Sequence, residues 1–139
     1  MVNDRLKHQN AEQDGSKYAA DFDYIMHKFC MQKFSSFLVD RDVVELGCYH
    51  GHMTRILSKC AKSVIAVDID DECLSRTGDR LANADNVTLV KAGFDEIVLE
   101  NPVDSVYFSH ALEHVQNPVK TLENIRAGIS AKRYIVIVP

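Results

Sequence analysis

The sequence predicts an α/β protein built on a mostly parallel sheet with flanking helices. Five short apolar runs recur along the 139 residues, and segments with helical spacing separate them. Each of the first four runs is followed within three residues by glycine, aspartate or serine. Strands that alternate with helices in this way are typical of βαβ units, whose crossovers are right-handed.

The N-terminal half begins with a polar stretch and a long helix. Residues 1–17 lack periodicity, and we expect a mobile arm or a short lid there. Apolar residues from Tyr18 to Leu38 recur near every 3.6 positions, which predicts a helix. Three elements are predicted next, a buried strand, a helix and a second strand, at Val43–Leu46, Met53–Cys60 and Ser63–Val67.

The C-terminal half continues the alternation of helices and strands. A helix is predicted over Asp71–Asn83, with acidic residues in the first turn, where the helix dipole favours them. Asn117 as N-cap and Pro118 at the first helical position begin another helix, and Gly128 ends it. The remaining predicted strands are Val87–Val90, Val103–Phe108 and Arg133–Val138.

Length and composition indicate one globular domain that binds neither nucleic acid nor membrane. Hydrophobic residues make up 46% and charged residues 26%, as is ordinary for such a domain. The net charge of −4 disfavours nucleic acid as a partner, because phosphate backbones favour dense basic faces. No apolar run approaches the ~20 residues that span a bilayer.

Cysteine usage and the N-terminus point to the cytoplasm. The four cysteines form no Cys-x-x-Cys pair, which argues against a zinc knuckle or a thioredoxin-type site. The polar start of the chain does not resemble a signal peptide. We therefore expect free thiols in a reducing compartment.

The first predicted strand runs directly into a turn that contains two glycines, Gly47 and Gly51. Gly47 lets the chain turn sharply, and Gly51 lets the next helix and a ligand approach closely. We expect the amides of this turn to donate hydrogen bonds to an anionic ligand group. A dinucleotide site would need G-x-G-x-x-G, but Tyr49 and His52 occupy its second and third glycine positions, which disfavours NAD and FAD. The alternative is a βα turn that binds nothing.

An acidic residue, Asp68, ends the second predicted strand. A carboxylate about 20 residues past the glycine turn can accept hydrogen bonds from both hydroxyls of a ribose. Asp70 or Asp71 is better placed to cap the next helix, which leaves Asp68 for a ligand.

Two segments carry a family resemblance. Glu45, Gly47 and Gly51 resemble the first motif of class I S-adenosylmethionine (SAM)-dependent methyltransferases, with Tyr49 in place of the middle glycine. The segment Leu112-Glu113-His114-Val115, followed by Pro118, resembles the Leu-Glu-His-Val segment of methyltransferases that act on small molecules.

The resemblance covers residues 40–139 and implies a Rossmann-like methyltransferase fold with strand order 3-2-1-4-5. Full-length members have two further strands, so we expect a SAM-binding domain over residues 18–139 that is short at its C-terminus. The fifth strand would then be an open edge, which a second copy could cover in a homodimer.

The resemblance also implies which residues hold the cofactor, S-adenosyl-L-methionine. It places Gly47 and its neighbours at the methionine part, Asp68 at the ribose and Ile69 at the adenine. Ala92-Gly93 replaces the family's Gly-Asp pair after the third strand. Phe94 could pack on the adenine and Asp95 could reach it, and the alternative is an exposed turn. In full, the implied cofactor contacts are Tyr18, Glu45, Gly47, Cys48, Tyr49, Gly51, Asp68, Ile69, Gly93, Phe94, Asp95 and Ser109.

Histidines after the fourth strand are the candidate catalytic residues. Methyl transfer is an in-line displacement in which the protein mainly positions the reactants, but a hydroxyl or ammonium acceptor must also lose a proton. His110 and His114 could accept it, although a histidine here could instead only shape the loop. His110, Glu113 and His114 could share one helical face as a zinc-like set, but we expect no metal.

The sequence therefore predicts a SAM-dependent methyltransferase that acts on a small-molecule acceptor. A non-catalytic module that binds SAM or S-adenosylhomocysteine (SAH) is the second hypothesis. A nicotinamide-dependent oxidoreductase is the third.

Overall fold

The computed structural model describes residues 17–139, with side chains described from Ile25 onward. The predicted N-terminal arm lies outside the described residues except for Lys17. The predicted long helix is present as α2 (Lys17–Leu38). The described part of the chain divides into two units between Ser35 and Ser36, and the second unit, Ser36–Pro139, contains the whole sheet.

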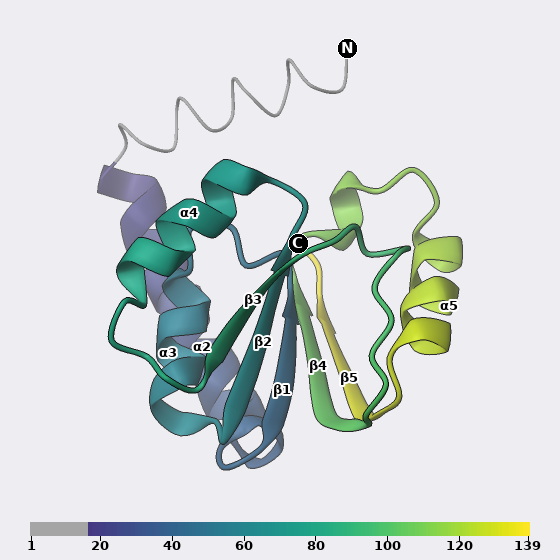
Figure 1. Ribbon diagram of the computed structural model, residues 1–139. Helices are drawn as coiled ribbons and strands as arrows, with labels where there is room; N and C mark the ends of the chain where they lie inside the picture. The colour runs from purple at the N-terminus through teal and green to yellow at the C-terminus, as the bar shows by residue number, and fades with distance from the viewer. Residues whose placement is uncertain (1–16) are drawn as a thin grey trace. The chain divides into compact units, whose positions relative to one another are not determined.

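The second unit is built on a five-stranded sheet in the order β3-β2-β1-β4-β5, with every neighbouring pair parallel (Figure 1). This confirms the predicted sheet type and strand order. The strands are β1 (Asp42–Leu46), β2 (Ser63–Asp68), β3 (Val87–Lys91), β4 (Val103–Ser109) and β5 (Ala131–Ile137).

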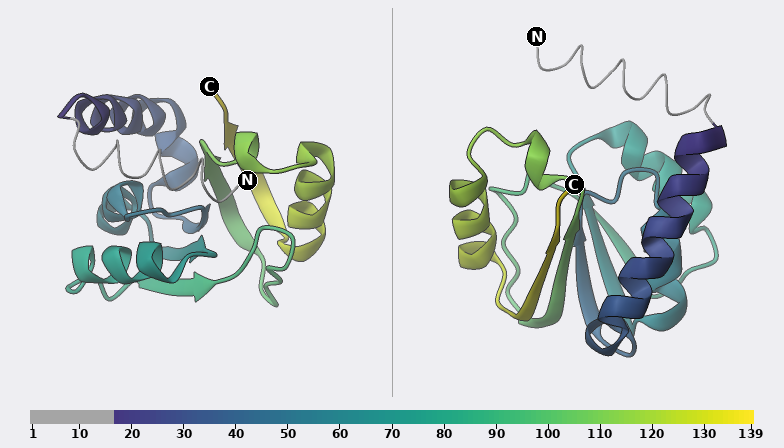
Figure 2. Two further views of the ribbon diagram at one scale, coloured as in Figure 1. Left: turned by 90° about the horizontal axis from the view of Figure 1, so that it is seen from above. Right: turned by 180° about the vertical axis from the view of Figure 1, so that it is seen from behind.

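Helices cover both faces of the sheet. Two helices, α3 (His52–Cys60) and α4 (Asp71–Arg80), lie on one face, and α5 (Pro118–Gly128) lies on the other (Figure 2). A single 3-10 turn, η1 (Leu112–His114), precedes α5. The helix predicted to reach Asn83 ends three residues earlier, because the backbone leaves the helical region at Leu81.

The predicted helix caps are confirmed. The Asp70 carboxylate accepts a hydrogen bond from the Cys73 backbone N–H at 2.9 Å, and the Asn117 side chain accepts one from the Lys120 N–H at 3.0 Å. Each side chain satisfies a helix N–H that has no partner within its own helix. Since Asp70 caps α4, the neighbouring Asp68 does not have to.

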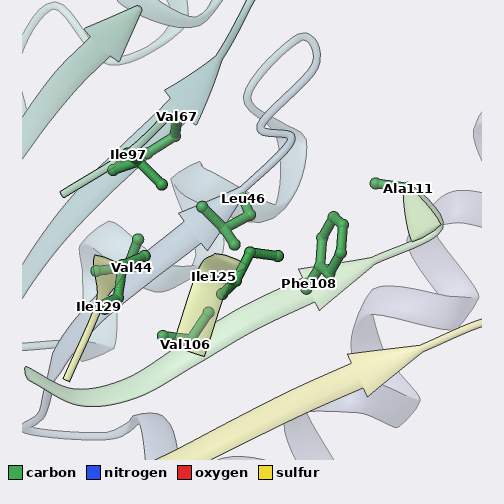
Figure 3. Packing of buried hydrophobic residues seen from close by; sticks show 9 residues of the cluster. All are labelled: Val44, Leu46, Val67, Ile97, Val106, Phe108, Ala111, Ile125 and Ile129. Carbon is green, nitrogen blue, oxygen red and sulfur yellow. The ribbon is translucent and has the colours of Figure 1, made fainter. Parts of the chain in front are cut away.

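Alternation along β1 assigns its residues to the two faces. Val44 and Leu46 join the core under α5, whereas Glu45 points to the α3 face, where it contacts Thr54. Figure 3 shows the cluster under α5, to which β1, β2, β4, the loop after β3, the segment after β4, and α5 contribute. Its members are Val44, Leu46, Val67, Ile97, Val106, Phe108, Ala111, Ile125 and Ile129.

No helix among residues 17–139 combines the length and the apolar character needed to cross a membrane.

Candidate functional site

The candidate site lies at the carboxyl edge of the sheet. From β1 the chain proceeds to β2 and β3 on one side, and then to β4 and β5 on the other. The switch point therefore lies between β1 and β4, and open α/β sheets bind ligands just beyond the strand ends at such a point. The predicted site residues from Glu45 onward all lie at the ends of β1 to β4 or in the segments that follow them.

The turn after β1 has an unusual backbone. Gly47 and Gly51 both have φ of 78°, and Tyr49 has φ of 50°. A Cβ on Gly47 would lie 3.3 Å from the Ala111 Cβ, and one on Gly51 would lie 2.8 Å from the Thr77 Cγ2. The turn thus requires glycine at both ends, for backbone conformation and for space.

Most amides of this turn have partners within the protein. The N–H groups of Gly47 and Cys48 donate to the Val67 carbonyl oxygen at 2.8 and 3.1 Å. The Tyr49 N–H donates to Asp68 Oδ2 at 3.0 Å, and the Gly51 N–H donates to the Cys48 carbonyl at 2.9 Å. The prediction that the turn presents its amides to an anion is wrong for these four, because the end of β2 and the turn itself supply their acceptors.

The Asp68 carboxylate is half-buried beside this turn. Its Oδ2 accepts the Tyr49 N–H, and its Oδ1 accepts the Asp70 N–H, both at 3.0 Å. Burial raises the pKa of Asp68, and the hydrogen bonds from Asp70 and Tyr49 oppose that rise. A carboxylate offers about four acceptor positions, more than the Tyr49 and Asp70 N–H groups occupy. Asp68 can therefore accept two hydroxyl protons of one ligand.

Glu45 lies inside the protein at 3% exposure. Thr54 on α3 donates a hydrogen bond from its Oγ1 to Glu45 Oε2 at 2.5 Å. Burial raises the pKa of Glu45 to about 8, and the negative charge of Asp68 adds to the effect, whereas the Thr54 hydrogen bond opposes it. Glu45 is therefore mostly protonated at neutral pH, and its predicted contact with the cofactor stays a prediction.

Cys48 is also held in its neutral form. Burial raises the pKa of the Cys48 thiol to about 12, and the charge of Glu45 contributes. Its Sγ lies 3.7 Å from the Thr77 Oγ1. The thiol is thus a packing group of the turn rather than a nucleophile.

The residues predicted at the adenine lie in two different environments. Ile69 is 67% exposed directly after Asp68, and a Cβ on Gly93 would lie 3.7 Å from its Cδ1. In contrast, the Phe94 ring packs edge-on against Phe108 with ring centroids 4.8 Å apart, and Asp95 Oδ1 accepts a hydrogen bond from Asn124 on α5. Ile69 and Gly93 therefore line one surface, whereas Phe94 and Asp95 contact the α5 side of the sheet. The Phe94 ring also reaches the glycine turn, because its Cζ would lie 3.5 Å from a Cβ on Gly47.

The segment between β4 and α5 contains no α-helix. His110 has φ of 50°, and its N–H donates to the Ile137 carbonyl at 2.9 Å, so it lies outside η1. The alternative in which His110, Glu113 and His114 share one helical face is not met, because only a single 3-10 turn, Leu112–His114, forms here. His110 Nδ1 lies 3.9 Å from Glu113 Oε1. Among the described side chains no group of three His, Cys, Asp or Glu residues could hold a metal ion.

Two predicted contacts have less structural detail. Ser109 is half-buried as the last residue of β4. Tyr18 lies in the first turn of α2, and its side chain is outside the described part of the chain. Both assignments stay predictions.

Sequence reasoning missed two residues of α4 that contact the glycine turn. Thr77 Oγ1 donates to the Tyr49 carbonyl at 2.9 Å, and Arg80 Nε donates to the His50 carbonyl at 2.8 Å. The burial of Thr77 arises only in the folded chain, so the sequence offers no local signal for these contacts. The pairing itself depends on how α4 packs beside the turn.

A cavity of about 730 Å³ lies elsewhere, between α5 and strands β4 and β5. It shares no lining residue with the candidate site, and its lining contains no acidic residue or histidine. The residues at the carboxyl ends of the strands are therefore the better candidate for the functional site than this cavity.

Comparison with known proteins identified similar domains. The model of a family described as a methyltransferase domain matches residues 18–138. The structure of the DhpI–SAH complex is 25% identical, with a TM-score of 0.69, over 93% of this chain and 64% of that chain. The search of curated proteins found no match.

Two further solved structures share the fold. The N-methyltransferase NodS from Bradyrhizobium japonicum WM9, in complex with SAH, is 15% identical with a TM-score of 0.69, over 86% of this chain and 60% of NodS. Phosphoethanolamine N-methyltransferase 1 from Haemonchus contortus, in complex with phosphoethanolamine and SAH, is 23% identical with a TM-score of 0.63, over 73% of this chain and 23% of that chain. The chain thus spans less than two thirds of the length of each.

Proposed function

This chain belongs to the methyltransferase domain family, and from that premise we propose that it binds SAM and transfers the methyl group to a small-molecule acceptor. The observation that carries the proposal is the pairing of Asp68 with the glycine turn, where the Tyr49 N–H and Asp68 Oδ2 are 3.0 Å apart. The Leu112–Val115 segment and the neighbours crystallised with SAM or SAH support it.

The chemistry of the edge fits this cofactor. Asp68 would accept hydrogen bonds from the two ribose hydroxyls, at the positions its backbone partners leave open. The exposed Ile69, with Gly93 beside it, would pack on the adenine. The methionine part would lie along Gly47, Cys48 and Tyr49 toward Ser109.

Methyl transfer would then depend on how the residues after β4 bind and orient the acceptor. Bound SAM supplies a methyl group activated by its sulfonium. His110 and His114 follow β4 at the switch point, so either could take the proton that a hydroxyl or ammonium acceptor releases. We place the SAM-binding domain at residues 18–139. We also propose a homodimer in which two copies pair along β5, because β5 is an edge strand of the described sheet.

We expect Asp68→Ala to weaken the binding of SAM and SAH at least tenfold, as measured by titration calorimetry. A charge-assisted hydrogen bond contributes about 1.5–3 kcal/mol, and about 1.4 kcal/mol is already a factor of ten in affinity. The matched control is Asp104→Ala. Asp104 lies at the amino end of β4, at the opposite end of the strands from the candidate site. Asp104 also accepts two hydrogen bonds, one from the Asp42 N–H at 3.0 Å and one from Lys132 Nζ at 2.7 Å. Unchanged affinity in the Asp68 variant would refute the assigned role.

Turnover is tested separately from binding. We expect tritium to pass from methyl-labelled SAM to at least one member of a panel of hydroxyl, amine and carboxylate acceptors. We expect the double variant His110→Asn/His114→Asn to transfer the methyl group more slowly. Micromolar SAM binding without transfer to any acceptor would favour the non-catalytic module. Binding of NAD in place of SAM would overturn the proposal altogether.

A further inference from the structure

We propose that Thr77 and Arg80 of α4 are positioning residues that hold the glycine turn in the shape the cofactor requires. This inference rests on the proposed function, because it concerns the same site. It gives α4, which carries none of the predicted cofactor contacts, a role in shaping the binding site. Neither Thr77 nor Arg80 would touch the cofactor itself.

The two side chains act on consecutive backbone carbonyls. Thr77 donates to the Tyr49 carbonyl at 2.9 Å, and Arg80 donates to the His50 carbonyl at 2.8 Å. Residues three apart on a helix lie on one face, so α4 presents both donors to the turn together. Thr77 is fully buried, which excludes water from its hydrogen bond.

Tyr49 is held from both sides by this arrangement. Its N–H donates to Asp68 at the end of β2, and its carbonyl accepts from Thr77 on α4. Its φ of 50° is a left-handed conformation, which is unfavourable for a residue with a side chain. The two hydrogen bonds offset that cost and fix the residue in place.

Close packing at Gly51 makes the contact between α4 and the turn rigid. A Cβ there would lie 2.8 Å from the Thr77 Cγ2 and 3.0 Å from the Thr77 Cα. Without the Thr77 hydroxyl, Tyr49 could relax toward ordinary φ values. Its N–H would then turn away from Asp68, and the carboxylate that faces the ribose would lose its fixed orientation.

The test compares Thr77→Val, which keeps the shape and removes the hydroxyl, with Thr77→Ser, which keeps the hydroxyl. We expect Thr77→Val to bind SAH about five- to tenfold more weakly by titration calorimetry at 15 °C, since one buried hydrogen bond corresponds to roughly that factor. We expect Thr77→Ser to bind within about twofold of the wild type, because its hydroxyl can still donate.

The control is Thr121→Val, the same change at a buried position of α5 outside the turn. It should lower stability without changing SAH affinity. Equal affinity of wild type and Thr77→Val would overturn the inference, as would an equal loss in Thr121→Val. Failure of the wild type to bind either SAH or SAM would instead overturn the proposed function.

Hydrogen exchange tests the inference without any ligand. We expect the Tyr49 amide to exchange at least tenfold faster in Thr77→Val than in the wild type, while Thr121→Val leaves it unchanged. Unchanged protection of the Tyr49 amide would show that Thr77 does not hold the turn, whether or not the chain binds SAH.

Discussion

Gly128→Ala is expected to lower the free energy of unfolding by about 3 kcal/mol or more, the upper part of the range for overpacked cores. Gly128 ends α5 where the backbone after β3 crosses the helix. A Cβ there would lie 2.1 Å from the carbonyl oxygen of Ile97 and 3.2 Å from its carbonyl carbon. Because the obstacle is backbone, no change of side-chain rotamer can relieve the clash.

The damage would extend into the core around this crossing. Ile97 and Ile129 are both buried in the cluster under α5, and the Leu99 N–H donates to the Gly128 carbonyl at 2.9 Å. Moving the two segments apart would open this packing and strain the hydrogen bond. Thermal unfolding should therefore show a melting temperature lower by about 10 °C, at ~2–4 °C per kcal/mol for a domain of this size.

Gly78→Ala provides the matched control, in the last turn of α4. A Cβ there would lie 3.4 Å from the Leu89 Cδ1, which is ordinary contact with the end of a flexible side chain. Alanine in a helix interior is favoured over glycine by roughly 0.5–1 kcal/mol, so this variant should be as stable as the wild type or slightly more stable. A Gly128 variant as stable as the Gly78 variant would contradict the close approach.

Stability is expected to fall by a few kcal/mol as pH rises from about 4.5 to about 8, through the titration of Glu45. Its pKa is about 8 in the folded protein and 4.5 as its ordinary value. Between these values the folded state keeps a proton that the unfolded state releases, so the unfolded state gains relative stability as pH rises. Below about 4.5 the group contributes no slope, and above about 8 the loss is complete.

Glu45→Gln isolates this contribution. Glutamine has the same shape and can accept the Thr54 hydrogen bond, but it does not ionise. Urea unfolding between pH 4.5 and 8.5 should therefore give a flatter stability profile for the variant, which becomes more stable than the wild type at the alkaline end. Groups that titrate alike in both proteins cancel in the difference between the two profiles, which therefore reports Glu45 and the groups coupled to it.

Glu123→Gln is the control for this experiment. Glu123 lies on the exposed side of α5 with 64% of its side chain accessible, 3.7 Å from Lys120. Its substitution should leave the pH profile parallel to that of the wild type. A Glu45 variant that also runs parallel to the wild type would contradict the burial of a neutral carboxyl at this position.

The type of sheet, and the end of the strands that carries the site, could be predicted from the amino-acid sequence. Five apolar runs separated by helical segments predicted a parallel α/β sheet, and the resemblance supplied its strand order. Gly47, Gly51 and Asp68 are identifiable because they lie at the end of β2 or in the turn after β1, which parallel topology brings to one edge. The caps at Asp70 and Asn117 were also predictable, because a cap bonds to residues two or three positions along the chain.

The hydrogen bonds that connect these residues depend on tertiary packing and could not be predicted from the sequence. The turn amides donate to Val67 and Asp68 on β2, and α4 holds the Tyr49 and His50 carbonyls, although neither partner is near the turn in sequence. Alternation could place Glu45 on one face of β1, but its raised pKa depends on burial and on contacts with Thr54 and Asp68. Local spacing in the sequence specifies the periodicity of each element and the positions where strands end. Hydrogen-bond partners and burial depend instead on how distant elements pack. The same holds for the His110–His114 segment, which forms only one 3-10 turn.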